Sequence, residues 1–131
     1  AGGRSRLVPA LKQHKPAVVI IALGANDGLR GLPLLQMREN LKAMVTAAQA
    51  AGARVLIAGM RLPPNYGPYA IEFHNSFGEI ARLGKASLLE FLLLPVAANL
   101  AYFQPDQLHP TADAQPLILD HVWPALLPLI K

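Results

Sequence analysis

The chain has 131 residues, 53% hydrophobic and 15% charged, a composition that excludes a largely disordered protein and is sufficient for a globular core. The absence of cysteine excludes disulfides, thiolate metal sites and a cysteine nucleophile. The net charge is +4, but the basic residues are scattered singly or in pairs, which is typical of a solvated surface and not of a nucleic-acid-binding stripe.

The first half of the chain alternates between predicted helices and short apolar strands. After a first helix, the continuous apolar run AVVIIAL at residues 17–23 predicts a strand covered on both faces, as in a parallel sheet. Apolar residues recur at helical spacing over residues 34–51, between Pro33 and Gly52, which predicts a helix that ends at the glycine. Residues 54–60 then predict a second buried strand.

The second half continues this alternation. A proline-rich loop at residues 63–68 leads to a helix over residues 69–83, and residues 87–94 predict a third strand that is followed by a long loop. The last helix begins near residues 111–113, and we expect Pro124 to kink or end it. Strands separated by single helices indicate right-handed crossovers and a three-layer α/β/α, flavodoxin-like sheet of parallel strands. The first strand is apolar enough for the interior of a sheet, where it would have a neighbour on each edge. Because the chain predicts only three strands, we expect further strands beside it.

Polar residues follow the first predicted strand, at the end where ligands bind in open parallel sheets. In Gly24-Ala25-Asn26-Asp27-Gly28 the glycines permit a sharp turn, which would leave the Asn26 amide over the sheet end as a donor to a developing oxyanion. Alternatively, Asn26 and Asp27 are ordinary turn residues whose side chains bond to their own backbone. Taken alone, the segment favours this second interpretation.

The loop before the last helix contains Asp106-Gln107-Leu108-His109-Pro110. At this spacing the carboxylate can reach the Nδ1–H of the imidazole and fix its tautomer, which leaves Nε2 free to act as a base. The alternative is a surface aspartate and a histidine packed near a helix N-terminus, and the spacing alone slightly favours it. The other histidines, His14, His74 and His121, fall on predicted helices without metal-ligand spacing.

Together, these segments resemble the third and fifth sequence blocks of the SGNH (GDSL) hydrolases. The segments at residues 25–31 and 61–68, with Asp113-Ala114-Gln115-Pro116 after the histidine, are similar to those of the bacterial thioesterase I and lysophospholipase-like arylesterases. The resemblance implies that Asn26 donates to the oxyanion, that His109 is the general base and that Asp106 orients it. It also implies a substrate-binding loop and an acyl-pocket wall, formed by Gly24, Ala25, Asp27, Gly28 and Leu29 and by Pro64, Asn65 and Tyr66 respectively.

The chain departs from this family's pattern in one respect. The Gly-Asp-Ser block with the nucleophilic serine and a second block with an oxyanion-hole glycine lie upstream of the matching region, and neither occurs here. Ser5, Ser76 and Ser87 lack that context, so none is carried over as the nucleophile. We therefore expect residues 1–131 to be one SGNH-hydrolase-like domain that is incomplete at its N-terminus and lacks the family's first strands.

The resemblance implies a serine hydrolase of carboxylic esters or thioesters, such as acyl-CoA, lysophospholipids or aryl esters, that is periplasmic or secreted. It implies no metal or organic cofactor, and its partners would be the small-molecule substrate and a complementing N-terminal segment or chain that supplies the serine. We expect no nucleic-acid partner and no stable membrane insertion, because the longest uncharged stretch, residues 91–105, is short and interrupted by Pro95. The alternative is a non-catalytic ligand-binding or partner-binding domain that has lost its nucleophile.

Overall fold

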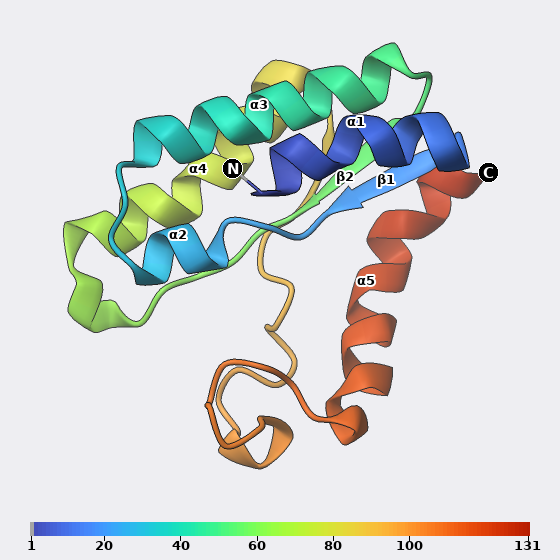
Figure 1. Cartoon of the computed structure of the whole chain (residues 1–131). Coiled ribbons are helices and arrows are strands. Elements are labelled where there is room, and N and C mark those ends of the chain that lie inside the picture. Colours follow the sequence, from blue (N-terminus) through green and yellow to red (C-terminus); the bar gives the residue numbers. More distant parts are fainter. Residues whose placement is uncertain (1) are drawn as a thin grey trace.

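A computed structural model describes residues 2–131 and shows a parallel three-stranded sheet with helices on both faces (Figure 1). The elements are α1 (Gly2–His14), β1 (Val18–Ile21), α2 (Ala25–Leu29), α3 (Leu34–Ala50), β2 (Arg54–Ala58), α4 (Pro68–Gly84), β3 (Ser87–Leu89) and α5 (Gln115–Ile130). Short 3-10 turns occur at Pro64–Tyr66, Leu100–Tyr102 and Ala112–Ala114. The predicted alternation of strands and helices is confirmed.

The strands lie in the order β1-β2-β3, and both pairs are parallel. Ile21 is opposite Ile57, and Ala58 is opposite Leu89, so the three strands end at the same edge of the sheet. Helices α3 and α4 are the crossovers between consecutive strands, as parallel neighbours require. The predicted α/β fold with a parallel sheet is therefore confirmed.

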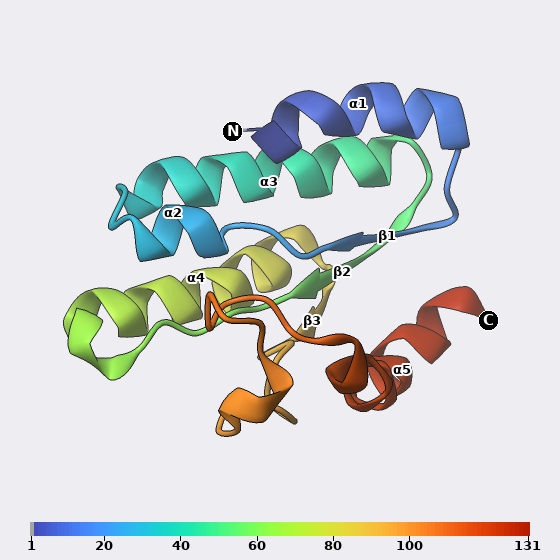
Figure 2. The same cartoon turned by 60° about the horizontal axis from the view of Figure 1, so that its bottom comes forward.

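The main core lies between the sheet and the helices α1, α3 and α4, and α5 contacts β2 and β3 from the other face (Figures 1 and 2). The centre of this core is formed by Met37 and Leu41 of α3 with Phe73 and Phe77 of α4, all almost fully buried. The two phenylalanine rings meet edge to face with centroids 5.2 Å apart, a favoured aromatic geometry. This packing holds α3 and α4 firmly under the sheet edge from which the loops emerge.

The end of α3 follows directly from its sequence. Gly52 has a φ of 87°, a left-handed conformation that side chains disfavour. Its N–H donates to the Gln49 carbonyl, and the N–H of Ala53 donates to the Ala48 carbonyl. These two bonds form a Schellman motif, so the predicted role of Gly52 in ending the helix is confirmed.

The third strand is shorter than predicted. Instead of residues 87–94, β3 covers only Ser87–Leu89. The chain then turns around Gly59, whose N–H donates to the Leu89 carbonyl and whose carbonyl accepts from the Leu92 N–H. The backbone of Glu90 lies so close to Gly59 that a side chain at that position would clash with it. This contact ends the strand pairing, although the apolar sequence continues.

Pro124 does not end the last helix. Helix α5 runs through both Pro124 and Pro128 to Ile130. A proline inside a helix costs about 3 kcal/mol, and α5 packs against β2 and β3 despite this cost. His121 Nε2 also donates to the Phe91 carbonyl at 2.9 Å, and the Arg54 guanidinium donates to the carbonyl of Leu129 at 3.3 Å.

Within the described residues the first strand has an open edge and an uncovered face, as the expectation of further strands beside it implies. In the described residues β1 pairs only with β2, and the side chain of Ile20 is 45% exposed. Helix α5 is also apolar but has no fully buried residue, and Trp123 is 44% exposed. The apolar edge of β1 and the apolar side of α5 therefore remain uncovered within residues 2–131. No helix in this range combines the length and apolar character needed to cross a membrane.

Candidate active site

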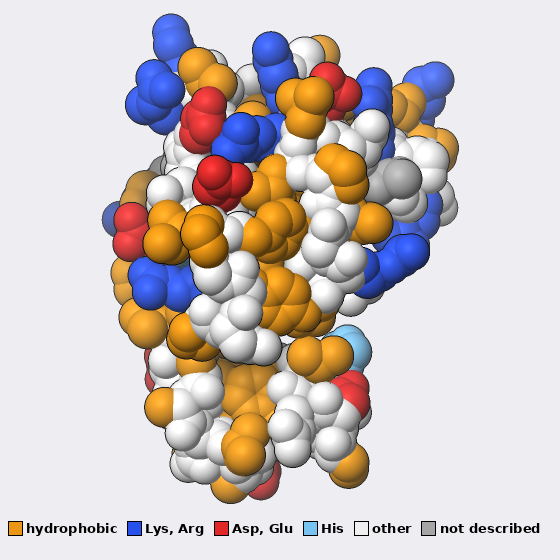
Figure 3. Space-filling view, turned by 90° about the vertical axis from the view of Figure 1, so that its left-hand side faces the viewer, with side chains coloured by type: hydrophobic (Ala, Val, Ile, Leu, Met, Phe, Trp, Pro, Cys, Tyr) orange, Lys and Arg blue, Asp and Glu red, His pale blue; other side chains and the backbone are white. Residues whose placement is uncertain are grey.

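A cavity of about 800 Å³ lies at the carboxyl ends of the strands, between the loops that leave β1, β2 and β3. Figure 3 looks onto this end of the molecule and shows hydrophobic side chains running down the middle of the face, with Lys and Arg side chains toward its edges. The lining is mostly apolar and includes Leu29, Phe73 and Phe91, together with Asn26 and His109. We call this space the site cavity.

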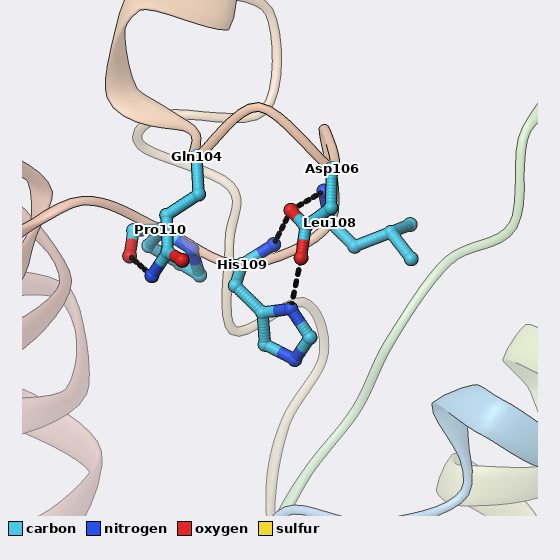
Figure 4. A network of polar contacts seen from close by, with 5 residues as sticks. All are labelled: Gln104, Asp106, Leu108, His109 and Pro110. Atoms are coloured by element: carbon cyan, nitrogen blue, oxygen red, sulfur yellow. Dashed lines mark hydrogen bonds and ion pairs between the residues drawn. The ribbon is translucent and has the colours of Figure 1, made fainter.

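Asp106 and His109 form a close pair in the loop before α5 (Figure 4). His109 Nδ1 lies 2.6 Å from Asp106 Oδ2, so the Nδ1–H donates to the carboxylate. Gln107 has a φ of 59°, and this left-handed turn brings the two side chains onto the same side of the loop. The other ring nitrogen, Nε2, points away from Asp106 (Figure 4) and is free to accept a proton.

The Asp106 carboxylate is held in its charged form. The hydrogen bond from the His109 side chain, followed by the backbone N–H groups of His109 and Leu108, lowers the pKa of Asp106 to about 2. The carboxylate is therefore ionised at neutral pH and can keep the proton of the imidazole on Nδ1. Both side chains are accessible, with 72% of His109 and 42% of Asp106 exposed.

Hydrogen bonds to backbone carbonyls around Asp106 and His109 hold the exposed loop in one conformation. The N–H of Gln104 donates to the His109 carbonyl at 2.7 Å, and its side chain donates to the Pro110 carbonyl at 3.2 Å (Figure 4). The N–H of Thr111 donates to the Tyr102 carbonyl at 2.8 Å. These bonds close the loop on itself, so the orientation of His109 does not depend on burial of its ring.

Asn26 reaches the same cavity from the end of β1. The segment after β1 was expected to be a loop, but Gly24, with a φ of 107°, turns the chain into the short helix α2. Asn26 is exposed and lines the site cavity with His109, and the two also line an adjoining cavity of about 380 Å³. Within residues 2–131 neither the Asn26 nor the Asp27 side chain bonds to its own backbone, so the turn-residue interpretation gains no support.

The other predicted substrate-binding residues lie around α2 in different roles. Ala25, Leu29 and Pro64 line the site cavity, whereas Gly24 and Asp27 line the adjoining one and do not line the site cavity. Gly28 is buried against the Phe73 ring, so closely that any side chain would clash with it. Asn65 and Tyr66 do not line either cavity.

Tyr66 and Tyr69 hold α2 in place from the neighbouring loop and α4. The Tyr66 hydroxyl donates to the Leu29 carbonyl at 2.8 Å, and the Tyr69 hydroxyl donates to the Leu32 carbonyl. Burial, and next the nearby Asp27 carboxylate, raises the pKa of Tyr69, which keeps its hydroxyl protonated as a donor. The family resemblance implies a place for Tyr66 in the acyl-pocket wall and no role for Tyr69. Neither hydroxyl hydrogen bond can be inferred from the residue spacing, because each joins segments that are 37 residues apart.

Removing both hydroxyls should loosen the α2 segment. We expect Tyr66→Phe with Tyr69→Phe to speed amide hydrogen exchange over residues 24–32 by roughly 5- to 50-fold, because each lost bond is worth about 1 kcal/mol. Mass spectrometry of peptides from the exchanged protein would measure this. Tyr102→Phe is the control, since its hydroxyl makes no hydrogen bond among residues 2–131. Equal exchange in the double variant and the control would contradict the anchoring role.

None of the serines lines the site cavity. Ser76 is fully buried, accepts from Arg38 Nε at 2.9 Å and donates to the Glu72 carbonyl, so it joins α3 to α4. Ser5 donates to the Gly2 carbonyl, and Ser87 begins β3 at the opposite end of the strand. Among residues 2–131 no group of three potential metal ligands is present.

Comparison with known proteins gives consistent matches. A sequence model of the GDSL-like Lipase/Acylhydrolase family matches residues 2–116. Esterase TesA of Pseudomonas aeruginosa is 47% identical over 131 residues, which cover 99% of this chain and 65% of that protein. Thioesterase 1/protease 1/lysophospholipase L1 of Escherichia coli K12 is 38% identical, with 98% of this chain and 62% of that protein covered. Arylesterase of Vibrio mimicus is 39% identical, with 92% and 60% covered.

Solved structures agree with these sequence matches. The crystal structure of TesA superposes with a TM-score of 0.93 at 46% identity, covering 98% of this chain and 72% of that one. The psychrotrophic esterase EstA from Pseudoalteromonas sp., inhibited by monoethylphosphonate, gives 0.91 at 42% identity, covering 98% and 71%. The present chain thus spans 60% to 65% of the length of the three named sequence relatives.

Proposed function

The chain belongs to the GDSL-like lipase/acylhydrolase family, and from this we propose that it forms part of a serine hydrolase that cleaves carboxylic esters or thioesters. The observation that carries the proposal is the 2.6 Å contact between Asp106 and His109 at a cavity that Asn26 also lines. This arrangement offers a charged orienting group, a base and an amide donor around one space. These are three of the components that acyl transfer needs.

The reaction would proceed through an acyl-enzyme. A serine hydroxyl attacks the substrate carbonyl, His109 Nε2 takes the serine proton, and Asp106 stabilises the imidazolium that forms. The Asn26 amide N–H donates to the oxyanion of the tetrahedral intermediate. His109 then gives its proton to the leaving group, and water releases the acid in a second step.

We place the nucleophilic serine outside these 131 residues, on a complementing segment or chain that completes one domain with residues 1–131. Two observations support this placement. Ser5, Ser76 and Ser87 all lie away from the site cavity, and the named relatives are longer than this chain. The uncovered edge of β1 and side of α5 offer apolar surface for the completing elements.

The substrate class follows from the cavity and from the relatives' names. A mostly apolar lining suits an acyl chain or an aromatic ring. The names arylesterase, thioesterase 1 and lysophospholipase L1 support aryl esters, acyl-CoA and lysophospholipids as candidates. We further propose a periplasmic or secreted location, which cell fractionation of the source organism would test.

A fluorophosphonate probe tests the chemistry directly. The complete enzyme should gain the mass of one phosphonyl group and hydrolyse p-nitrophenyl esters of short or medium acids. The 131-residue chain alone should gain none, because no serine lies beside His109. A label on Ser5, Ser76 or Ser87 would overturn the placement of the nucleophile. An unlabelled complete protein that still binds acyl ligands would instead be a non-catalytic binding domain.

A further inference from the structure

Among residues 2–131, Arg61 is the only Lys or Arg that lines the site cavity. It lies in the chain just after β2, is exposed, and has its guanidinium carbon 5.7 Å from the centroid of the Phe91 ring. At this distance the guanidinium and the aromatic face attract each other by a cation–π contact, which does not use the N–H donors of the guanidinium. Phe91 lines the cavity too, so the pair lies at its wall.

The charge of Arg61 has no counterpart nearby. None of the residues that line the site cavity is Asp or Glu, and among residues 2–131 no carboxylate lies within 4.0 Å of its guanidinium. By contrast, Arg38 bonds to Ser76 and pairs with Glu79, and Arg54 bonds to carbonyls at the end of α5. Arg61 is therefore a cation at an apolar cavity without an acidic partner.

The sheet register places this cation at the same end of the molecule as the reacting groups. Ile21 of β1 is paired with Ile57 of β2, and Asn26 and Arg61 follow these residues at nearly equal distance along the chain. Adjacent parallel strands lie about 4.8 Å apart. A substrate of modest length whose carbonyl is at Asn26 and His109 can thus extend to Arg61.

We propose that Arg61 binds an oxyanion, a phosphate or carboxylate carried by the substrate away from the reacting carbonyl. The planar guanidinium matches both groups with paired hydrogen bonds. The preferred substrate is then an amphiphile, with its apolar part in the cavity and its charge on Arg61. This inference rests on the proposed function, because it assumes that esters enter the site cavity.

The test compares neutral and anionic esters in the complete enzyme and its Arg61→Gln variant. The neutral ester is p-nitrophenyl octanoate, and the anionic ones are the octanoyl ester of p-hydroxybenzoate and the p-nitrophenyl monoester of octanedioate. We expect Arg61→Gln to lower kcat/KM for at least one anionic ester by roughly 10- to 100-fold, mainly through KM, because a charge-assisted hydrogen bond is lost. The neutral ester should change less than about 3-fold. The affected anionic ester shows whether the charge belongs to the leaving group or to the acyl chain.

A matched control and a binding measurement complete the test. Arg30→Gln removes the same charge from an exposed arginine that does not line the cavity, and it should alter none of the three rates. Dodecyl phosphate, measured by calorimetry, should bind the unmodified enzyme, and Arg61→Gln should weaken this binding by a similar factor of roughly 10 or more. Equal losses on neutral and anionic esters, or unchanged binding of dodecyl phosphate, would overturn the role of Arg61. If the unmodified enzyme hydrolyses no ester but binds dodecyl phosphate through Arg61, the proposed function fails while the anion site stands.

Discussion

Replacing His109 with alanine in the complete enzyme should lower kcat for p-nitrophenyl butyrate by roughly 10⁴- to 10⁶-fold. The imidazole is the only titratable group of the site cavity whose free nitrogen can accept the serine proton. Without it, the amide donor and substrate binding alone would remain, and these give only a small part of triad catalysis. Steady-state hydrolysis followed at the absorbance of p-nitrophenolate would measure the loss.

His14→Ala is the matched control for this variant. His14 is exposed at the end of α1 and does not line the site cavity, so its removal should leave kcat within a factor of about 2. An equal and small effect of the two substitutions would remove His109 from the mechanism.

The Asp106 carboxylate should contribute to catalysis over most of the pH range. Its pKa falls from an ordinary value of 3.8 to about 2 in the fold, so the charged hydrogen bond is fully present above about pH 4 and is lost as the pH falls toward 2. Asp106→Asn should therefore lower kcat by roughly 10⁴-fold at neutral pH, through loss of the imidazole tautomer. The loss should not recover at higher pH, which distinguishes it from a mere shift of the pH profile.

Asn26→Ala should lower kcat by roughly 10²- to 10³-fold with little change in KM. Asn26 lines the cavity, and its side-chain amide has no hydrogen-bond partner among residues 2–131, so its N–H groups are available to a developing oxyanion. Because the bond strengthens only when the carbonyl oxygen becomes charged, its removal affects the transition state more than the bound substrate. The ratio of kcat to KM effects would measure this.

Two further variants sharpen the test of Asn26. Asn26→Asp keeps the shape but replaces the donor with a negative charge, so its loss should exceed that of Asn26→Ala. Asn75→Ala is the control, because Asn75 is exposed on α4 and does not line the site cavity. A change confined to KM in Asn26→Ala would make Asn26 a substrate-binding residue only.

The features that the sequence predicted well are those with local causes. The end of α3 depends on Gly52 and its immediate neighbours, and the strands and crossover helices follow from the apolar pattern. The pairing of Asp106 with His109 is equally local, since only two residues lie between them in the chain. The spacing makes this pairing possible, and the resemblance to the family favours it over a surface aspartate and a separately packed histidine.

The errors arose where distant segments decide the outcome. Strand β3 ends at Leu89, where the backbone of Glu90 packs against Gly59 just after β2, and helix α5 does not end at Pro124, although the expectation allowed a kink there instead.

By itself the sequence determined the α/β class and the order of the strands and longer helices, and its resemblance to a known family identified the candidate residues Asn26, Asp106 and His109. Only the tertiary structure decided that Asn26 and His109 line one cavity, that the tyrosines anchor α2 there, and that Arg61 lies on Phe91 without an acidic partner. The physical reason is that parallel strands gather their carboxyl ends at one edge of the sheet. Side chains that are far apart in the chain therefore meet at this edge. Their contacts depend on the strand register and on helix packing, and the residue spacing within one segment does not predict them.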